Sequence, residues 1–75
     1  MKPGDYYIDN YFEPETIVLK VTDIMGADGH ECIVVYTSNP TRMYKDYIVA
    51  RQSNDEDLIP VAMITIDNKV ILIKL

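Results

Sequence analysis

Short apolar runs dominate this chain, and they either alternate with polar residues or form brief continuous stretches, as is typical of β-strands. Residues 16–23 alternate cleanly, with Ile17, Leu19 and Val21 on one face. This alternation predicts a half-buried strand. Residues 31–37 contain the run CIVVY, which is apolar on both faces and therefore predicts a central strand.

The C-terminal part of the chain predicts a second hairpin. Residues 58–66 are rich in β-formers, and residues 70–75 follow them across the turn sequence DNK. Residues 6–12 hold four aromatic side chains in seven positions, a composition that favours a strand over a helix. We therefore expect a first strand there.

Residues 40–52 allow two interpretations. Asn39 is a suitable helix N-cap, Pro40 suits the first helical position, and apolar residues follow at helical spacing. Residues 44–49, however, are rich in strand formers and lie among predicted strands. We favour a strand and keep one helix at about residues 40–52 as the alternative.

These elements predict an all-β fold in one domain that covers residues 1–75, with an α+β fold containing that one helix as the alternative. The chain is too short for a second domain. Five or six short strands in so small a domain favour a curled sheet that closes into a barrel, because closure removes edge strands.

The segments KPGDYY, EPETIVLKVTDI and CIVVYT, in that order, resemble the Tudor and related SH3-like barrels over roughly residues 2–50. The resemblance implies a small SH3-like barrel and an aromatic cage for a methylated arginine or lysine. On this basis Tyr36 matches the aromatic residue at the end of the central strand, and Tyr7 lies near the first wall of the cage. Tyr11 or Phe12 would supply another wall, because the chain has Ser38 where the family often places a second aromatic.

The charge of the chain narrows the choice of partners. Twelve carboxylates against seven basic side chains give a formal charge of −5, and the basic residues are scattered singly. Such a chain repels nucleic acid and anionic membrane surfaces and favours a basic protein or peptide. The N-terminal residues lack the apolar core of a secretory signal, and no apolar run approaches a bilayer-spanning length. We expect a soluble, cytoplasmic protein.

The segment DIMGADGHEC, residues 23–32, carries the only histidine and the only cysteine. Its oxygen and glycine spacing does not fit a calcium loop of the EF-hand type, and His30 and Cys32 alone cannot complete a zinc site. A tight turn at Asp28-Gly29 explains the segment better, with Cys32 as a small core residue and His30 exposed. One cysteine also excludes an intramolecular disulfide. We expect no metal, no cofactor and no catalytic residue.

Two sets of residues remain as candidates for binding. The acidic run Asp55, Glu56 and Asp57 predicts a solvated loop that attracts a basic partner. Aromatic and acidic residues alternate between Tyr6 and Glu13, a pattern that suits the recognition of cationic or proline-rich peptides. The predicted peptide-binding residues are Tyr7, Tyr11, Phe12 and Tyr36.

The last predicted strand is apolar on both faces, so one domain core cannot cover all of it. We expect self-association through Ile71, Ile73 and Leu75, with a homodimer as the outcome. The sequence therefore predicts a non-enzymatic peptide-binding module that favours basic partners. The alternatives are a self-assembling structural protein and a small acidic inhibitor that blocks a larger protein.

Overall fold

A computed structural model describes residues 1–75 and confirms the all-β fold. There is no α-helix, and the only helical element is a single 3-10 turn, η1. The elements are β1 (Tyr6–Asp9), η1 (Asn10–Phe12), β2 (Ile17–Met25), β3 (Gly29–Thr37), β4 (Ile48–Gln52), β5 (Leu58–Ile66) and β6 (Lys69–Lys74). No helix of the structure is long and apolar enough to span a bilayer.

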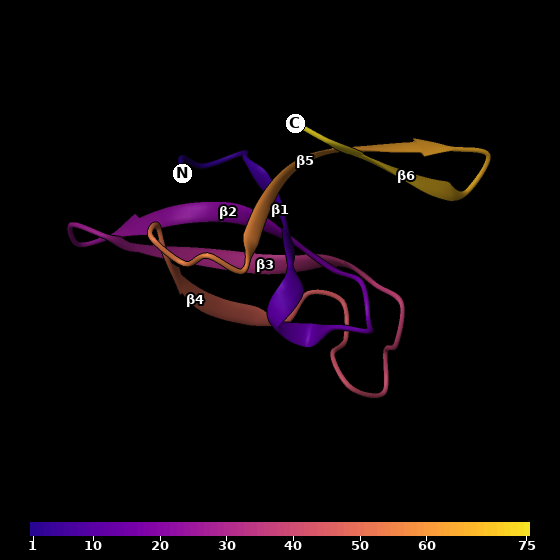
Figure 1. Ribbon diagram of the computed structural model, residues 1–75, viewed down its shortest axis with the longest axis horizontal. Helices are drawn as coiled ribbons and strands as arrows, with labels where there is room; N and C mark the ends of the chain where they lie inside the picture. Colours follow the sequence, from indigo (N-terminus) through magenta and orange to yellow (C-terminus); the bar gives the residue numbers. More distant parts are fainter.

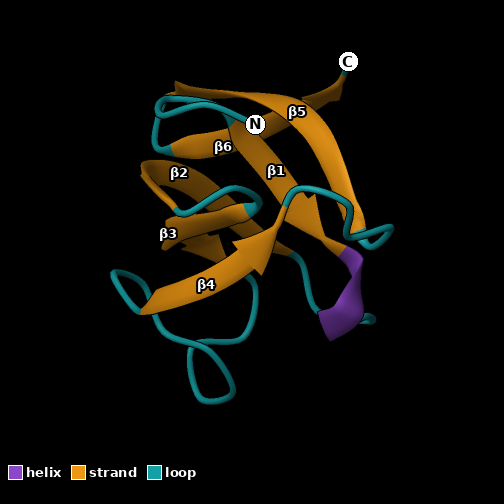
Figure 2. Ribbon diagram, turned by 90° about the vertical axis from the view of Figure 1, so that its left-hand side faces the viewer, coloured by secondary structure: helices purple, strands orange, loops and turns teal.

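All six strands belong to one antiparallel sheet in the order β4-β3-β2-β1-β5-β6 (Figure 1). The expected closed barrel is not seen, because β4 and β6 remain the two free edges of the sheet. The sheet is instead curled, with β5 and β6 on one side of the molecule and β2, β3 and β4 on the other (Figure 2). Irregular pairing between β2 and β3, at Val18/Leu19 and at Val21/Asp23, contributes to this curvature, since bulges bend a strand.

The core forms on one side of the paired strands β2 and β3. Ile17, Leu19 and Val21 are at most 1% exposed, as their alternation predicts, and they pack with Cys32 and Val34 of β3. The pattern did not predict that Val18, on the opposite face of β2, is buried as well. The strand is therefore covered on both sides at its start.

The alternative helix at residues 40–52 is wrong. Asn39 does begin one turn, in which its carbonyl accepts a hydrogen bond from the Met43 amide at 3.1 Å. The backbone then reverses at Asp46, whose φ of 71° lies outside the helical region, and enters β4. The strand interpretation holds for the second half of the segment only.

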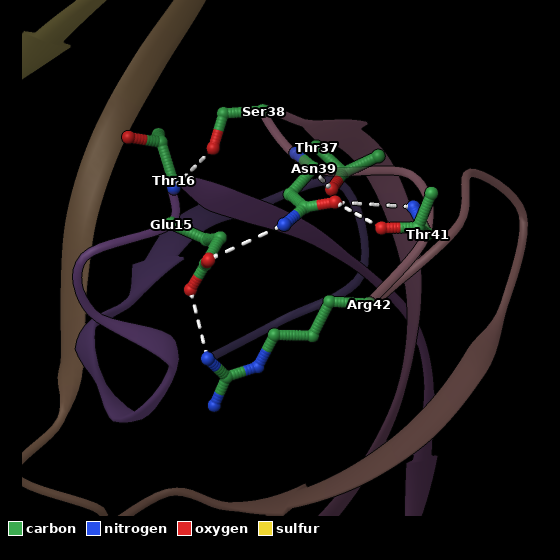
Figure 3. A network of polar contacts seen from close by, with 7 residues as sticks. All are labelled: Glu15, Thr16, Thr37, Ser38, Asn39, Thr41 and Arg42. Carbon is green, nitrogen blue, oxygen red and sulfur yellow. Dashed lines mark hydrogen bonds and ion pairs between the residues drawn. The ribbon is translucent and has the colours of Figure 1, made fainter.

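A polar cluster ties this loop to the segment before β2 (Figure 3). The Asn39 side chain donates to Glu15 Oε1 at 3.3 Å and accepts from the hydroxyl of Thr41 at 2.6 Å. Arg42 completes the cluster with an ion pair to Glu15 at 3.0 Å, and the Thr16 amide donates to Ser38 Oγ at 2.8 Å. These groups satisfy one another, so the cluster has a structural role.

One turn and one strand end differ from expectation in detail. The β2–β3 hairpin turns where predicted, but the residue with positive φ is Gly26, at 69°, and Gly29 already belongs to β3. A Cβ on Gly29 would lie 2.6 Å from the carbonyl oxygen of Met25, so Gly29 permits a close approach of the two strands. The first strand is also shorter than predicted, because it ends at Asp9 and continues as η1.

Candidate peptide-binding groove

An open groove of about 380 Å³ lies between η1 and the connection from β4 to β5. It unites two segments that the sequence indicates as separate binding candidates, the aromatic segment around Tyr11 and the acidic run that begins at Asp55. The groove is lined by Tyr11, Ala50, Arg51, Gln52, Asn54 and Asp55.

An ion pair between β1 and β4 brings these segments together. The Nε of Arg51 donates to Asp9 Oδ2 at 2.7 Å, and the Asp9 side chain is fully buried. The other carboxylate oxygen of Asp9 accepts from the backbone amide of Tyr11 at 3.1 Å, so that Asp9 caps η1. One carboxylate therefore fixes both the arginine and the tyrosine at the edge of the groove.

Tyr11 is 71% exposed, an unusual state for an aromatic side chain. Its ring meets the ring of Phe12 edge-on at a centroid distance of 5.3 Å. Phe12 in turn packs against the core, and the Arg51 guanidinium lies 5.8 Å from the centre of its ring. Tyr11 thus rests against a half-buried ring and is itself largely open to solvent.

The acidic loop is held beside η1 by its backbone. The amide of Asn10 donates to the Asp57 carbonyl at 2.9 Å, and Asp55 Oδ1 accepts from the amide of Asp57 at 2.9 Å. Glu56 and Asp57 are exposed, while Asp55 is half-buried in the wall of the groove. The loop therefore has a defined position relative to Tyr11.

The only basic side chain that lines the groove, Arg51, is already paired. Arg51 uses Nε for Asp9 and one terminal nitrogen for the Ala50 carbonyl, at 2.8 Å. Asp55 has no basic partner, and exposed Glu56 and Asp57 follow it in the loop. An approaching cation would meet an aromatic face and unpaired carboxylates.

The four predicted peptide-binding residues do not gather in one cage. Tyr11 lines the groove, whereas Tyr7 and Phe12 are half-buried against the core. Tyr36 lies opposite Val18 on β3 and does not line the groove. Asp9 organises the site, but local sequence patterns do not identify it, because its partner Arg51 is 42 residues away and the pairing depends on the curl of the sheet.

The histidine and the cysteine of the first hairpin lie in the interior. Cys32 is fully buried, and burial raises the pKa of its thiol above the ordinary value of 9.0. His30, which we expected to be exposed, is only 5% exposed, and its Nε2 lies 3.1 Å from the Met1 carbonyl oxygen. No three side chains of the metal-binding types come together in a cluster.

A second groove, of about 320 Å³, lies where β1 meets β5. It is mostly apolar and has one carboxylate at its rim, that of Asp5. The groove is lined by Asp5, Tyr6, Tyr7, Pro60, Val61, Ala62 and Leu75. Burial and the nearby Asp5 carboxylate raise the pKa of the Tyr7 hydroxyl above its ordinary value of 10.0.

Comparisons with known protein families, with curated proteins and with solved structures found no match to this chain.

Proposed function

We propose that this protein is a non-enzymatic module that binds a basic segment of another protein in the groove between η1 and the β4–β5 loop. The observation that carries the proposal is the juxtaposition of exposed Tyr11 with the unpaired carboxylate of Asp55 on one groove. An arginine or lysine side chain fits such a site, since its charge is attracted both by an aromatic face and by a carboxylate.

The wall formed by β4 adds a place for the backbone of the bound segment. β4 is an edge strand, and Ala50, Arg51 and Gln52 of this strand line the groove. Extended peptides bind to exposed sheet edges by adding a strand, with pockets for alternate side chains. Gln52 and Asn54 supply further hydrogen-bonding groups beside the basic side chain.

The interior positions of His30 and Cys32 support the non-enzymatic part of the proposal. Nucleophilic catalysis needs a nucleophile and a base that a substrate can reach, and these two side chains are at most 5% exposed. The similarity to Tudor and SH3-like domains and a cytoplasmic setting remain predictions that are compatible with this function.

The test is a titration of the protein with labelled extended peptides that carry one arginine, one lysine or one glutamine in an otherwise uncharged context. We expect the basic peptides to bind and the glutamine peptide to bind about tenfold more weakly, as for a cation–π contact reinforced by a carboxylate. Added salt should weaken the binding of the basic peptides.

Three variants locate the site. We expect Tyr11→Ala to weaken binding of the arginine peptide about tenfold and Asp55→Asn by somewhat less. Tyr44→Ala is the matched control, because Tyr44 is also exposed, at 59%, and does not line the groove. Equal binding of the glutamine and arginine peptides, or an equal loss in Tyr44→Ala, would contradict the proposal.

A further inference from the structure

The β5–β6 hairpin has one face that is apolar and exposed. Paired residues share a face of a sheet, and the register places Ile64 opposite Ile71 and Ala62 opposite Ile73. Alternation adds Ile66 to this face of β5 and Leu75 to the end of β6. The five large side chains on this face are 42–81% exposed: Ile64, Ile66, Ile71, Ile73 and Leu75. We call them the hairpin face.

The hairpin face continues the side of the sheet that forms the core. Tyr7 packs against the core and pairs with Pro60 of β5, so alternation places the hairpin face on the same side of the sheet as Tyr7. Pro60 is itself exposed, and the one buried residue of the hairpin, Val61, points to the other side. The tip of the hairpin extends past the other strands (Figure 1). The hairpin face therefore extends beyond the strands that could cover it.

Carboxylates are scarce in the β5–β6 hairpin. Residues 58–75 contain one carboxylate, Asp67, and two lysines, whereas residues 1–57 contain eleven carboxylates and five basic side chains. Two copies of so acidic a protein repel each other through most of their surface. The hairpin is the segment through which they can approach without bringing carboxylates together.

The hairpin face is also complementary to itself. Lys69 pairs with Ile66 and so lies at the tip end of the face, while Asp5 lines the second groove together with Leu75 at the opposite end. A twofold axis through the middle of the face places Lys69 of each copy near Asp5 of the other. The isoleucines of the two faces then pack against each other between these charges.

We propose that the hairpin face binds a second copy of this chain, in a symmetric dimer with Lys69 of one protomer opposite Asp5 of its partner. This inference goes beyond the peptide-binding groove, which lies on η1, β4 and the β4–β5 loop and shares no lining residue with the hairpin face. A dimer would carry two such grooves, and two linked sites bind a partner with two basic segments more tightly than one site does.

Sedimentation equilibrium of the full 75-residue chain tests the proposal. We expect a dimer of twice 8.6 kDa at tens of micromolar protein. Ile73→Lys should raise the dissociation constant about 100-fold or more, because it places a charge in the middle of the apolar contact. Ile48→Lys is the matched control, since Ile48 lies on the other edge strand and is 53% exposed, close to the 48% of Ile73.

A charge exchange tests the orientation. Lys69→Glu and Asp5→Lys should each weaken the dimer several-fold, and the double variant should restore it to within about twofold of the original. Circular dichroism of each variant monitors folding. The proposal would be overturned by a monomer at all concentrations, or by a dimer that Ile48→Lys disrupts and Ile73→Lys does not. The twofold arrangement would be overturned if the double variant dimerises no more tightly than the single variants.

Discussion

Residues 1–57 and residues 58–75 both form β-strands, but the first region contains nearly all of the buried core and the second leaves five large aliphatic side chains exposed. Eight of the nine buried residues lie in residues 1–57, and Val61 is the only one in the β5–β6 hairpin. Yet the hairpin is the more apolar segment, with a large aliphatic side chain at most positions of β6. Burial in this molecule thus depends on what lies opposite a strand, because β2 and β3 face covering elements and the end of the hairpin does not.

The sharpest test of this contrast compares one large side chain from each region. Leu19→Ala should lower the free energy of unfolding by about 3–5 kcal/mol, since it leaves a cavity among fully packed neighbours. Ile71→Ala, at a position 44% exposed, should cost the monomer less than about 1 kcal/mol. Urea denaturation at a protein concentration low enough to favour monomers measures both values. Similar losses in the two variants would mean that the hairpin face is covered within the monomer.

The second test concerns the ion pair that joins β1 to β4, for which the hairpin has no counterpart. Arg51→Met leaves the Asp9 carboxylate buried without its charged partner, and removal of one member of a buried pair typically costs about 3 kcal/mol or more. We expect a loss of about 2–4 kcal/mol, because the exposed fraction of the Arg51 side chain, 19%, admits some water to the site.

The double variant Asp9→Asn with Arg51→Met provides the control. It removes both charges, so its stability should lie above that of Arg51→Met alone. Peptide binding should be weaker in the double variant than in the original protein, because the contact between Asp9 and Arg51 that holds η1 beside β4 is lost, although an asparagine can still accept from the Tyr11 amide. A stability loss equal to the sum of the two single losses would show that the two side chains do not interact.

Local patterns sufficed to predict much of this fold. The alternation of Ile17, Leu19 and Val21 identified the core strand, and the turn residues DNK located the last hairpin, where Asp67 and Asn68 adopt the positive φ angles of a tight turn. In each case the information lies within a few residues of the chain. Such signals need no knowledge of distant partners.

The features that were missed depend on contacts between distant segments. Whether the sheet closes is decided by the relation of β4 to β6, and these strands are the two edges of the sheet in the structure. His30 looked like a turn residue, but its place on the inner face of β3 and its contact with the Met1 carbonyl remove it from solvent. The groove could be predicted only as two separate candidates, since Tyr11 and Asp55 are brought together by the pair Asp9–Arg51.

The smallest expected effect is a loss of unfolding free energy in alkaline solution that comes from groups in residues 1–57. Cys32 and Tyr7, both in residues 1–57, have raised pKa values, chiefly because burial disfavours their charged forms. A group whose pKa is higher in the folded state binds its proton more tightly there, so its contribution to stability is complete below the unfolded pKa and is lost as the pH rises through the folded pKa. The loss should therefore begin near pH 9.0 for Cys32 and near pH 10.0 for Tyr7.

Urea denaturation at a series of pH values from 7 upward measures this loss. Tyr7→Phe keeps the ring and removes the hydroxyl, so the decline in unfolding free energy above about pH 10 should become shallower in this variant. Cys32→Ala should make the decline in unfolding free energy that begins near pH 9.0 shallower, because the thiol is removed. The same variant should also lower the stability at every pH, because it leaves a small cavity. Tyr44→Phe is the control for removal of a tyrosine hydroxyl at an exposed position. If neither Tyr7→Phe nor Cys32→Ala alters the slope, burial of these two groups does not account for the alkaline loss of stability.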